Sequence, residues 1–192
     1  MDPLFSIVIA NYNYGRFLEE AIQSVLAQIG EGASQVRPGE VELIIIDGGS
    51  SDDSVDVIKK YAGGLQSGEV KVRGEGEQWN SSIISYWISE KDKGQSDAFN
   101  KGFAKARGRF LTWLNADDVM LPGALAAVKR EIERHPEAEW ITGSSLWTDE
   151  NLRVKRCFCA HRFSTLRARC GGLSVGGPSS FFTKRLFILN LI

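Results

Sequence analysis

The feature that most constrains the fold is a repeated alternation of short apolar runs with segments of helical periodicity. Leu4 to Ala10 and Val41 to Ile46 are continuous apolar runs rich in Ile and Val, which is typical of strands buried on both faces. Each run is followed by apolar residues at helical spacing, within Gly15 to Gln28 and Asp53 to Tyr61. This alternation predicts an α/β fold with a mostly parallel, doubly wound sheet and helices on both faces.

The same alternation continues to about residue 142. We expect further strands at Ile83 to Ile88, Arg109 to Leu114 and Glu139 to Thr142, and helices at Ser96 to Ala106 and Pro122 to Arg134, with Pro122 in the first helical turn. Beyond Leu146 the periodicity weakens and predicts no further elements. The length of 192 residues, 43% of them hydrophobic, fits a single domain with a substantial core.

Composition and charge limit the cellular compartment and the kinds of partner that we expect. No apolar run approaches the roughly 20 residues of a membrane-spanning helix, the first residues lack a signal-peptide pattern, and three cysteines are an odd number. We therefore expect a cytoplasmic protein. Residues 151–192 carry eight Lys and Arg and no carboxylate, although the net charge of the chain is −1. We expect this basic segment to pack on an acidic neighbour or to contact phosphate or the inner face of a membrane, and we expect no nucleic-acid partner.

Polar residues follow four of the predicted strands. They are Asn11 to Asn13, Asp47 to Asp52, Glu90 to Gly94, and Asn115 to Asp118. In an open α/β sheet, ligands bind beyond the carboxyl ends of the strands, so these segments are candidates for a site. Taken singly, most of these residues are also ordinary helix caps and turn residues.

The adjacent carboxylates of Asp117 and Asp118 are harder to explain structurally, because two like charges at the end of a buried strand repel each other. A hard divalent cation, Mn²⁺ or Mg²⁺, compensates such a pair together with substrate phosphates. No glycine-rich dinucleotide fingerprint or P-loop follows any strand. The sequence therefore predicts that any bound phosphate is held through a metal ion.

Together these segments resemble the family-2 glycosyltransferases, and the likeness runs from about Phe5 to Arg185. Its pieces occur in the family's order: Ile7 to Asn13, Ile44 to Asp52, Lys93 to Gly102, Ala106 to Gly108, and Trp113 to Asp118, with Gly177 to Phe182 similar to an acceptor-side segment. The resemblance implies a GT-A type, Rossmann-like fold. It also implies a donor and metal half at about 1–120 and an incomplete acceptor half at about 121–192.

The resemblance implies a site at these segments. Tyr12 and Asp47 are expected to contact the nucleotide base or ribose, Asp97 to line the donor pocket, and Asp117 and Asp118 to divide ribose contact and metal coordination. The full set implied for the donor nucleotide is Asn11, Tyr12, Asn13, Asp47, Gly48, Gly94, Asp97, Asn100, Asn115 and Asp117, and the metal ligands are Asp117 and Asp118. Many members have a second acid at the position of Gly48, so the nucleobase stays open, and Asn115 stands where the first Asp of the metal motif often stands.

The implied function is metal-dependent, inverting transfer of a sugar from a nucleotide-diphosphate donor to an acceptor hydroxyl on a glycan or a lipid-linked acceptor. The family's general base is an Asp beyond the Phe181-Phe182 region, and no acid follows Glu150 here, so we expect a truncated chain that transfers slowly. His161 is the substitute candidate. Self-association is expected through an uncovered apolar patch at Phe181, Phe182, Leu186, Phe187 and Ile188.

Three alternatives remain open. The first is a catalytically weak nucleotide-diphosphate-binding module of the same fold, and the second is a nucleotidyltransferase, although no glycine-rich basic loop follows the first strand. The third is a zinc site formed by Cys157, Cys159, His161 and Cys170, whose single-residue gaps are tighter than zinc sites usually have.

Overall fold

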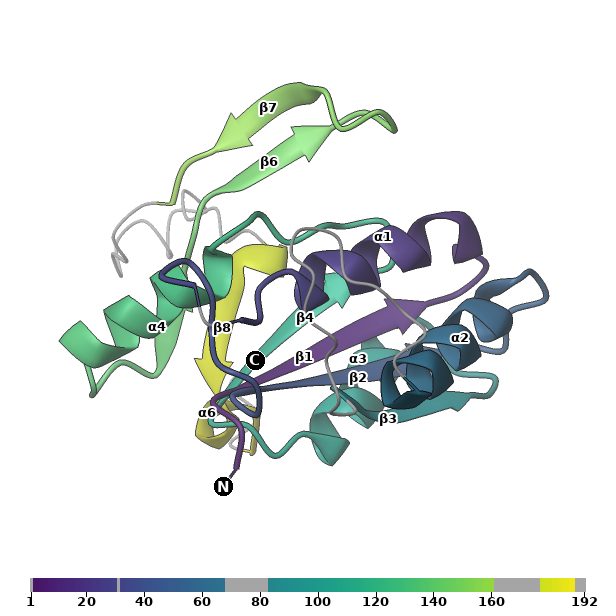
Figure 1. Cartoon of the computed structure of the whole chain (residues 1–192), viewed down its shortest axis with the longest axis horizontal. Coiled ribbons are helices and arrows are strands. Elements are labelled where there is room, and N and C mark those ends of the chain that lie inside the picture. The colour runs from purple at the N-terminus through teal and green to yellow at the C-terminus, as the bar shows by residue number, and fades with distance from the viewer. Residues whose placement is uncertain (1, 31, 68–82, 161–176, 189–192) are drawn as a thin grey trace.

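The computed structural model describes residues 2–30, 32–67, 83–160 and 177–188 of the chain. Its centre is a six-stranded sheet with the strand order β3-β2-β1-β4-β8-β5 (Figure 1). The four strands β1 (Phe5–Asn11), β2 (Val41–Asp47), β3 (Ile84–Ser89) and β4 (Phe110–Asn115) pair in parallel. The predicted α/β fold with a mostly parallel sheet is confirmed.

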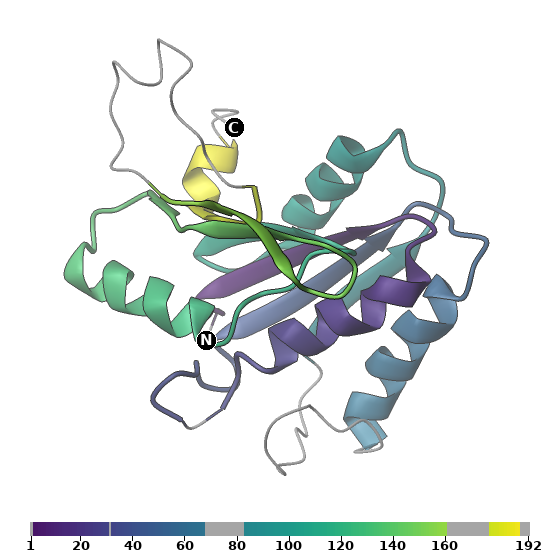
Figure 2. The ribbon, with the colours of Figure 1, turned by 90° about the horizontal axis from the view of Figure 1, so that it is seen from above.

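Helices cover both faces of this sheet (Figure 2). The helices are α1 (Gly15–Leu26), α2 (Ser54–Ser67) and α4 (Ala124–Arg134) on one face, and α3 (Gln95–Lys105) and α6 (Lys184–Ile188) on the other. Successive side chains of a strand point to opposite faces, so Ile7 and Ile9 pack under the first group while Val8 packs under the second. Both faces need apolar residues, which explains the continuous apolar runs in the sequence.

The far side of the sheet is antiparallel and was only partly predicted. Strand β8 (Ser180–Thr183) lies between β4 and β5 (Trp140–Thr142) and runs antiparallel to both. A 3₁₀ turn, η1 (Gly177–Ser179), leads into β8. The segments expected to form a donor half and an acceptor half therefore share one sheet. A separate hairpin of β6 (Ser145–Thr148) and β7 (Val154–Phe158) lies outside this sheet, where the sequence predicted no element.

The prediction of an uncovered apolar patch at the end of the chain is wrong for Phe181 and Phe182. Phe181 and Phe182 are 3% and 1% exposed, because β8 inserts into the sheet and both rings enter the core. Phe187, half-buried, packs against the Phe103 ring at 5.4 Å between centroids, and Leu186 is half-buried as well. Only Ile188 of the five residues is exposed, so this patch gives no basis for self-association.

Helix α4 begins two residues later than the sequence predicted. Pro122 lies in a turn before the helix, and Gly123 adopts a left-handed conformation with φ of +78°. That conformation cannot continue a right-handed helix, so α4 begins at Ala124.

A buried carboxylate fastens the end of the sheet that lies opposite the carboxyl ends of the strands. Glu42 is 3% exposed and accepts hydrogen bonds from Ser6 Oγ at 2.6 Å and from Arg107 N at 2.6 Å and Nε at 3.0 Å. At the next residue there is no room for a side chain, since a Cβ on Gly108 would lie 2.7 Å from the backbone N of Ser6. The Arg107-Gly108 pair thus has a structural role where α3 leads into β4.

We expect Glu42→Gln to lower the free energy of unfolding at pH 7 by about 2 kcal/mol. Burial alone raises the pKa of Glu42, but hydrogen bonds from Ser6 and Arg107 outweigh it and hold the pKa below its ordinary value of 4.5. A lowered folded pKa means that the ionised carboxylate stabilises the fold above about pH 4.5 and that this contribution is lost as the pH falls further. Urea unfolding from about pH 3 to pH 7 should therefore show a flatter pH dependence in the variant. Glu137→Gln, at a side chain that is 79% exposed, is the control, and equal behaviour of the two variants would contradict the prediction.

Candidate functional site

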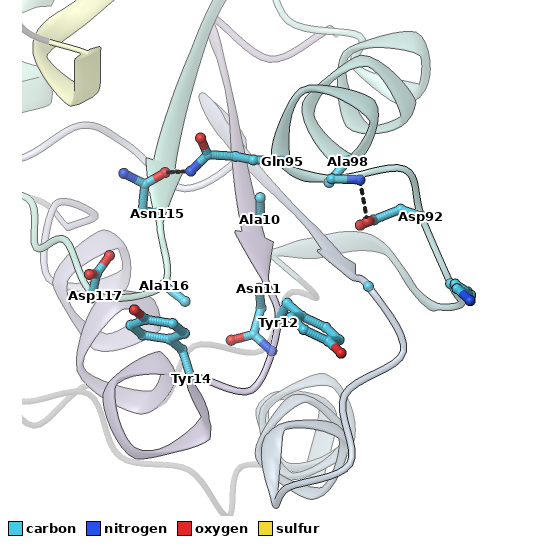
Figure 3. Close-up of a pocket in the computed structure, with 13 residues that line it drawn as sticks. Ala10, Asn11, Tyr12, Tyr14, Asp92, Gln95, Ala98, Asn115, Ala116 and Asp117 are labelled. Carbon is cyan, nitrogen blue, oxygen red and sulfur yellow. Dashed lines mark hydrogen bonds between the residues drawn. The ribbon is translucent and has the colours of Figure 1, made fainter.

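A cavity of about 590 Å³ lies at the carboxyl ends of the parallel strands. Its walls come from the ends of β1, β2 and β4 and from the segment that leads into α3 (Figure 3). The lining residues are Ala10, Asn11, Tyr12, Tyr14, Gly48, Lys91, Asp92, Gly94, Gln95, Ala98, Asn115, Ala116 and Asp117. Parallel α/β sheets bind ligands at this edge, as the sequence predicted.

Two tyrosines that follow β1 form one wall of the cavity. Tyr12 is 61% exposed and Tyr14 is 44% exposed, which leaves much of both rings open to solvent. Between them, Asn13 adopts a left-handed conformation with φ of 56°, and its Oδ1 accepts from Ser51 N at 2.8 Å. Asn13 N donates to Ser50 Oγ at 2.8 Å. Asn13 therefore does not line the cavity but fixes the turn that presents the two rings.

Asp47, at the end of β2, is buried and does not line the cavity. Its side chain is 0% exposed and accepts hydrogen bonds from Asn11 Nδ2 at 2.7 Å, Ser50 N at 3.0 Å, Ser50 Oγ at 2.5 Å and Ser89 Oγ at 2.6 Å. Burial alone raises its pKa, but these donors outweigh burial and lower it. The donors turn this side chain inward, away from the cavity, whereas the sequence predicted that Asp47 contacts the nucleotide; that contact stays a prediction. Asp47 ties together the ends of β1, β2 and β3 instead.

The buried end of β1 leaves one acceptor unused. Asn11 is 4% exposed, and its Oδ1 has no hydrogen-bond partner in the described part of the chain, while its Nδ2 is committed to Asp47. Asn11 lines the cavity as a residue, but its Oδ1 is itself buried, so it stays an unpaired acceptor within the protein.

The segment before α3 contributes Asp92, Gly94 and Gln95 to the cavity. Gly94 has φ of +107°, and its N–H donates to Asp92 Oδ1 at 2.8 Å. Asp97 lies in the first turn of the helix, where its Oδ2 accepts from Lys93 N at 3.1 Å and lies 3.5 Å from Lys101 Nζ. The pKa of Asp97 is lowered, and the hydrogen bond from the backbone N–H of Lys93 is the largest cause.

The end of β4 carries the two carboxylates that the sequence singled out. Asp117 is exposed and lines the cavity, whereas Asp118 is half-buried behind it. Asn115 connects both walls, since its Oδ1 accepts from Gln95 Nε2 at 2.7 Å and its Nδ2 donates to Asp118 Oδ2 at 2.8 Å. Burial raises the pKa of Asp118, and the charge of Asp117 raises it further. A bound cation would relieve both effects.

The donor set at this end fits a hard divalent ion that keeps other ligands. In the part of the chain that the structure describes, no group of three or more His, Cys, Asp or Glu side chains could hold a metal. Asp117 and Asp118 therefore offer two carboxylates at most, which suits Mg²⁺ or Mn²⁺ completed by water and phosphate oxygens and does not suit a protein-enclosed site.

The structure brings together part of the predicted nucleotide set. Asn11, Tyr12, Gly48, Gly94, Asn115 and Asp117 line the cavity, and Asn13, Asp47, Asp97 and Asn100 do not. Direct contact of any of them with a nucleotide stays a prediction. The sequence predicted Lys91 and Asp92 only as part of the segment Glu90 to Gly94, and Gln95 only as part of the segment Lys93 to Gly102, without naming any of them as a donor contact. Tyr14, which also lines the cavity, was not predicted.

The cysteine cluster is described only in part, because His161 and Cys170 lie outside the described residues. Cys157 and Cys159 are exposed, with 3.8 Å between their Sγ atoms. His161, the candidate base, is therefore not part of the site described here.

Among the described helices, none is long and apolar enough to cross a bilayer.

Solved structures share this fold. A crystal structure of S. aureus TarS has a TM-score of 0.67 and 19% identity, covering 100% of this chain and 50% of that one. The mannosyltransferase PcManGT of Pyrobaculum calidifontis, solved with GDP-Man and Mn²⁺, has a TM-score of 0.63 and 15% identity, covering 99% of this chain and 47% of that one. At such identities the similarity shows the fold alone.

Sequence relatives are longer than this chain. An uncharacterized glycosyltransferase of Nostoc sp. is 39% identical over 123 residues, which are 64% of this chain and 31% of that protein. A PGL/p-HBAD biosynthesis glycosyltransferase of Mycobacterium bovis is 28% identical over 169 residues, 88% of this chain and 57% of that protein. The chain thus spans 31% and 57% of the length of these two relatives. Residues 6–143, which include every strand end around the cavity, match glycosyl transferase family 2, and the chain belongs to that family.

Proposed function

We propose that this chain is the donor-binding part of a metal-dependent, inverting glycosyltransferase that transfers a sugar from a nucleotide diphosphate to an acceptor hydroxyl. The observation that carries the proposal is the cavity, where the exposed rings of Tyr12 and Tyr14 and the carboxylate of Asp117 lie at the carboxyl ends of the strands (Figure 3). Asp118, the next residue after Asp117, adds a second carboxylate at the end of β4. An aromatic wall suits a nucleobase, and two carboxylates suit a cation that binds a diphosphate.

Asp117 and Asp118 would hold Mn²⁺ or Mg²⁺ together with the phosphates of the donor. When bound, the ion supplies positive charge that stabilises the departing diphosphate. The chain's own contribution is orientation: Gln95 donates to Asn115, and Asn115 donates to Asp118, which fixes the carboxylate before the donor arrives. Inverting transfer also needs a general base near the acceptor hydroxyl, and we assign none among the described residues.

The ligands of two solved structures with this fold support the donor class. TarS has been solved with UDP-GlcNAc and PcManGT with GDP-Man and Mn²⁺. We propose a glycan or lipid-linked hydroxyl as acceptor. One observation keeps a second candidate, a nucleotide-diphosphate-binding module with weak activity: residues 151–192 contain no Asp or Glu to act as base.

Isothermal titration of the chain with UDP and GDP, with and without Mn²⁺, tests the donor site. We expect binding that requires the metal. Transfer of sugar from UDP-GlcNAc and GDP-Man to candidate acceptors is then measured. This measurement distinguishes an active enzyme from a module that only binds the nucleotide. No binding of either nucleotide with the metal present would overturn both candidates.

Tyr12→Ala is expected to weaken nucleotide binding by about tenfold, because base–aromatic stacking contributes about 1–3 kcal/mol. Tyr12→Phe keeps the ring and should bind like the unaltered chain. The readout is the dissociation constant of UDP or GDP in Mn²⁺. Equal affinity of the Ala and Phe variants would show that the exposed ring does not contact the base.

A further inference from the structure

At the corner of the cavity beside Tyr12, a carboxylate occupies the space that a side chain on Gly48 would fill. A Cβ on Gly48 would lie 2.8 Å from Oδ2 of Asp92 and 3.3 Å from Cδ2 of Tyr12. Backbone strain does not explain this glycine, since the neighbouring Gly49 has a positive φ and Gly48 does not. The missing side chain allows Asp92 to approach the Tyr12 ring.

Asp92 is held in this corner with one oxygen available to a ligand. Its Oδ1 accepts from Gly94 N at 2.8 Å, which fixes the direction of the carboxylate. Its Oδ2, the atom next to Gly48, accepts no hydrogen bond from any residue in the described ranges. Asp92 is half-buried and lines the cavity. A fixed acceptor therefore stands beside an exposed aromatic ring.

The two ends of the cavity differ in what they can accept. Figure 3 shows Tyr12 and Asp92 on one side of the cavity and Asn115 with Asp117 on the other. A diphosphate is repelled by a carboxylate that no ion compensates, so the phosphates belong at the end where Asp117 and Asp118 share a cation. The base of a bound nucleotide is thereby directed to the end with Tyr12 and Asp92.

We propose that Asp92 reads the nucleobase of the donor and selects bases that carry a ring N–H. This inference rests on the proposed function. A carboxylate only accepts hydrogen bonds. Uracil presents N3–H and guanine presents N1–H to such a group, whereas adenine and cytosine present an unprotonated ring nitrogen whose lone pair faces the carboxylate. The site therefore prefers uridine and guanosine diphosphates over adenosine and cytidine diphosphates.

Titration of the chain with UDP, GDP, ADP and CDP in Mn²⁺ tests this selection. We expect UDP and GDP to bind at least about tenfold more tightly than ADP and CDP, the difference that a hydrogen bond to a charged group makes. Asp92→Ala and Asp92→Asn should lower the affinity for UDP and GDP until the four nucleotides bind alike. Asp56→Ala, which removes an exposed carboxylate on α2, should change nothing.

The most specific test moves the carboxylate from position 92 to position 48. Gly48→Asp alone should disturb the corner, because its Cβ meets the Asp92 carboxylate. In the Asp92→Ala background the two nearest atoms, both of the Asp92 carboxylate, are gone and the next, in the Tyr12 ring, lies at 3.3 Å, so Gly48→Asp should restore the preference for UDP and GDP. Thermal unfolding checks that each variant is folded.

Two outcomes separate this inference from the function it rests on. Equal binding of all four nucleotides by the unaltered chain, or an unchanged preference in folded Asp92→Ala, would overturn the role of Asp92 and leave the donor site standing. Binding of none of the four would overturn the proposed function, and this inference with it.

Discussion

Replacing Asp117 and Asp118 together by asparagine is expected to lower the affinity for UDP or GDP in Mn²⁺ by about 100-fold or more and to remove the difference between titrations with and without the metal. Asparagine keeps the shape of each side chain and removes its charge. The end of β4 then offers the cation no carboxylate, and no group of three or more His, Cys, Asp or Glu side chains among the described residues could hold it instead. The measurement is the dissociation constant with and without Mn²⁺, with Asp56→Asn on α2 as the matched control.

The stability of the same variant separates a ligand site from a structural one. Burial and the charge of Asp117 raise the pKa of Asp118, so the ionised carboxylate costs stability at neutral pH and that cost disappears as the pH falls. Neutral side chains should therefore leave the melting temperature unchanged or higher while the affinity falls. A lower melting temperature together with unchanged metal-dependent affinity would show that the pair is structural.

The parallel half of the fold was predictable because its strands are buried on both faces. All seven residues of β2 are buried, and so its sequence from Val41 to Ile46 is apolar except for the paired Glu42. Strand β8 gave no such signal. It has four residues and lies between β4 and β5, and it pairs with segments about 40 and 70 residues earlier in the chain, which no local pattern records.

The position of the site was predictable, but the direction of its side chains was not. The carboxyl ends of parallel strands converge, so a residue that directly follows a strand lies at the right edge whatever its neighbours are. Asp47 is the last residue of β2 and Asp92 lies three residues beyond the end of β3, so both lie at this edge, yet only Asp92 lines the cavity. Asn11, Ser50 and Ser89 donate to Asp47 and turn it inward, and those donors come from three separate strand ends.

Asp47→Ala is expected to lower the free energy of unfolding by about 3 kcal/mol at neutral pH, since it leaves several buried donors without their charged acceptor. Asp52→Ala should cost only about 1 kcal/mol, the usual effect of losing a helix-capping group. Asp52 is exposed, and its carboxylate accepts from Ser54 at the start of α2 and from Gly15 N at the start of α1. Chemical denaturation of both variants at pH 7 measures the difference.

The effect of Asp47→Ala on nucleotide binding follows from the same contacts. Asn11 and the turn at Ser50 lose the group that positions them, so we expect weaker binding than in Asp52→Ala, and we expect this loss to be indirect. The pKa of Asp47 lies below its ordinary value of 3.8, so its stabilising contribution is present at neutral pH and lost as the pH falls below about 4. The free energy of unfolding of Asp47→Ala should therefore decrease less at acidic pH than that of the unaltered chain. Full stability with a large loss of affinity would instead mean that Asp47 turns outward and contacts the nucleotide itself.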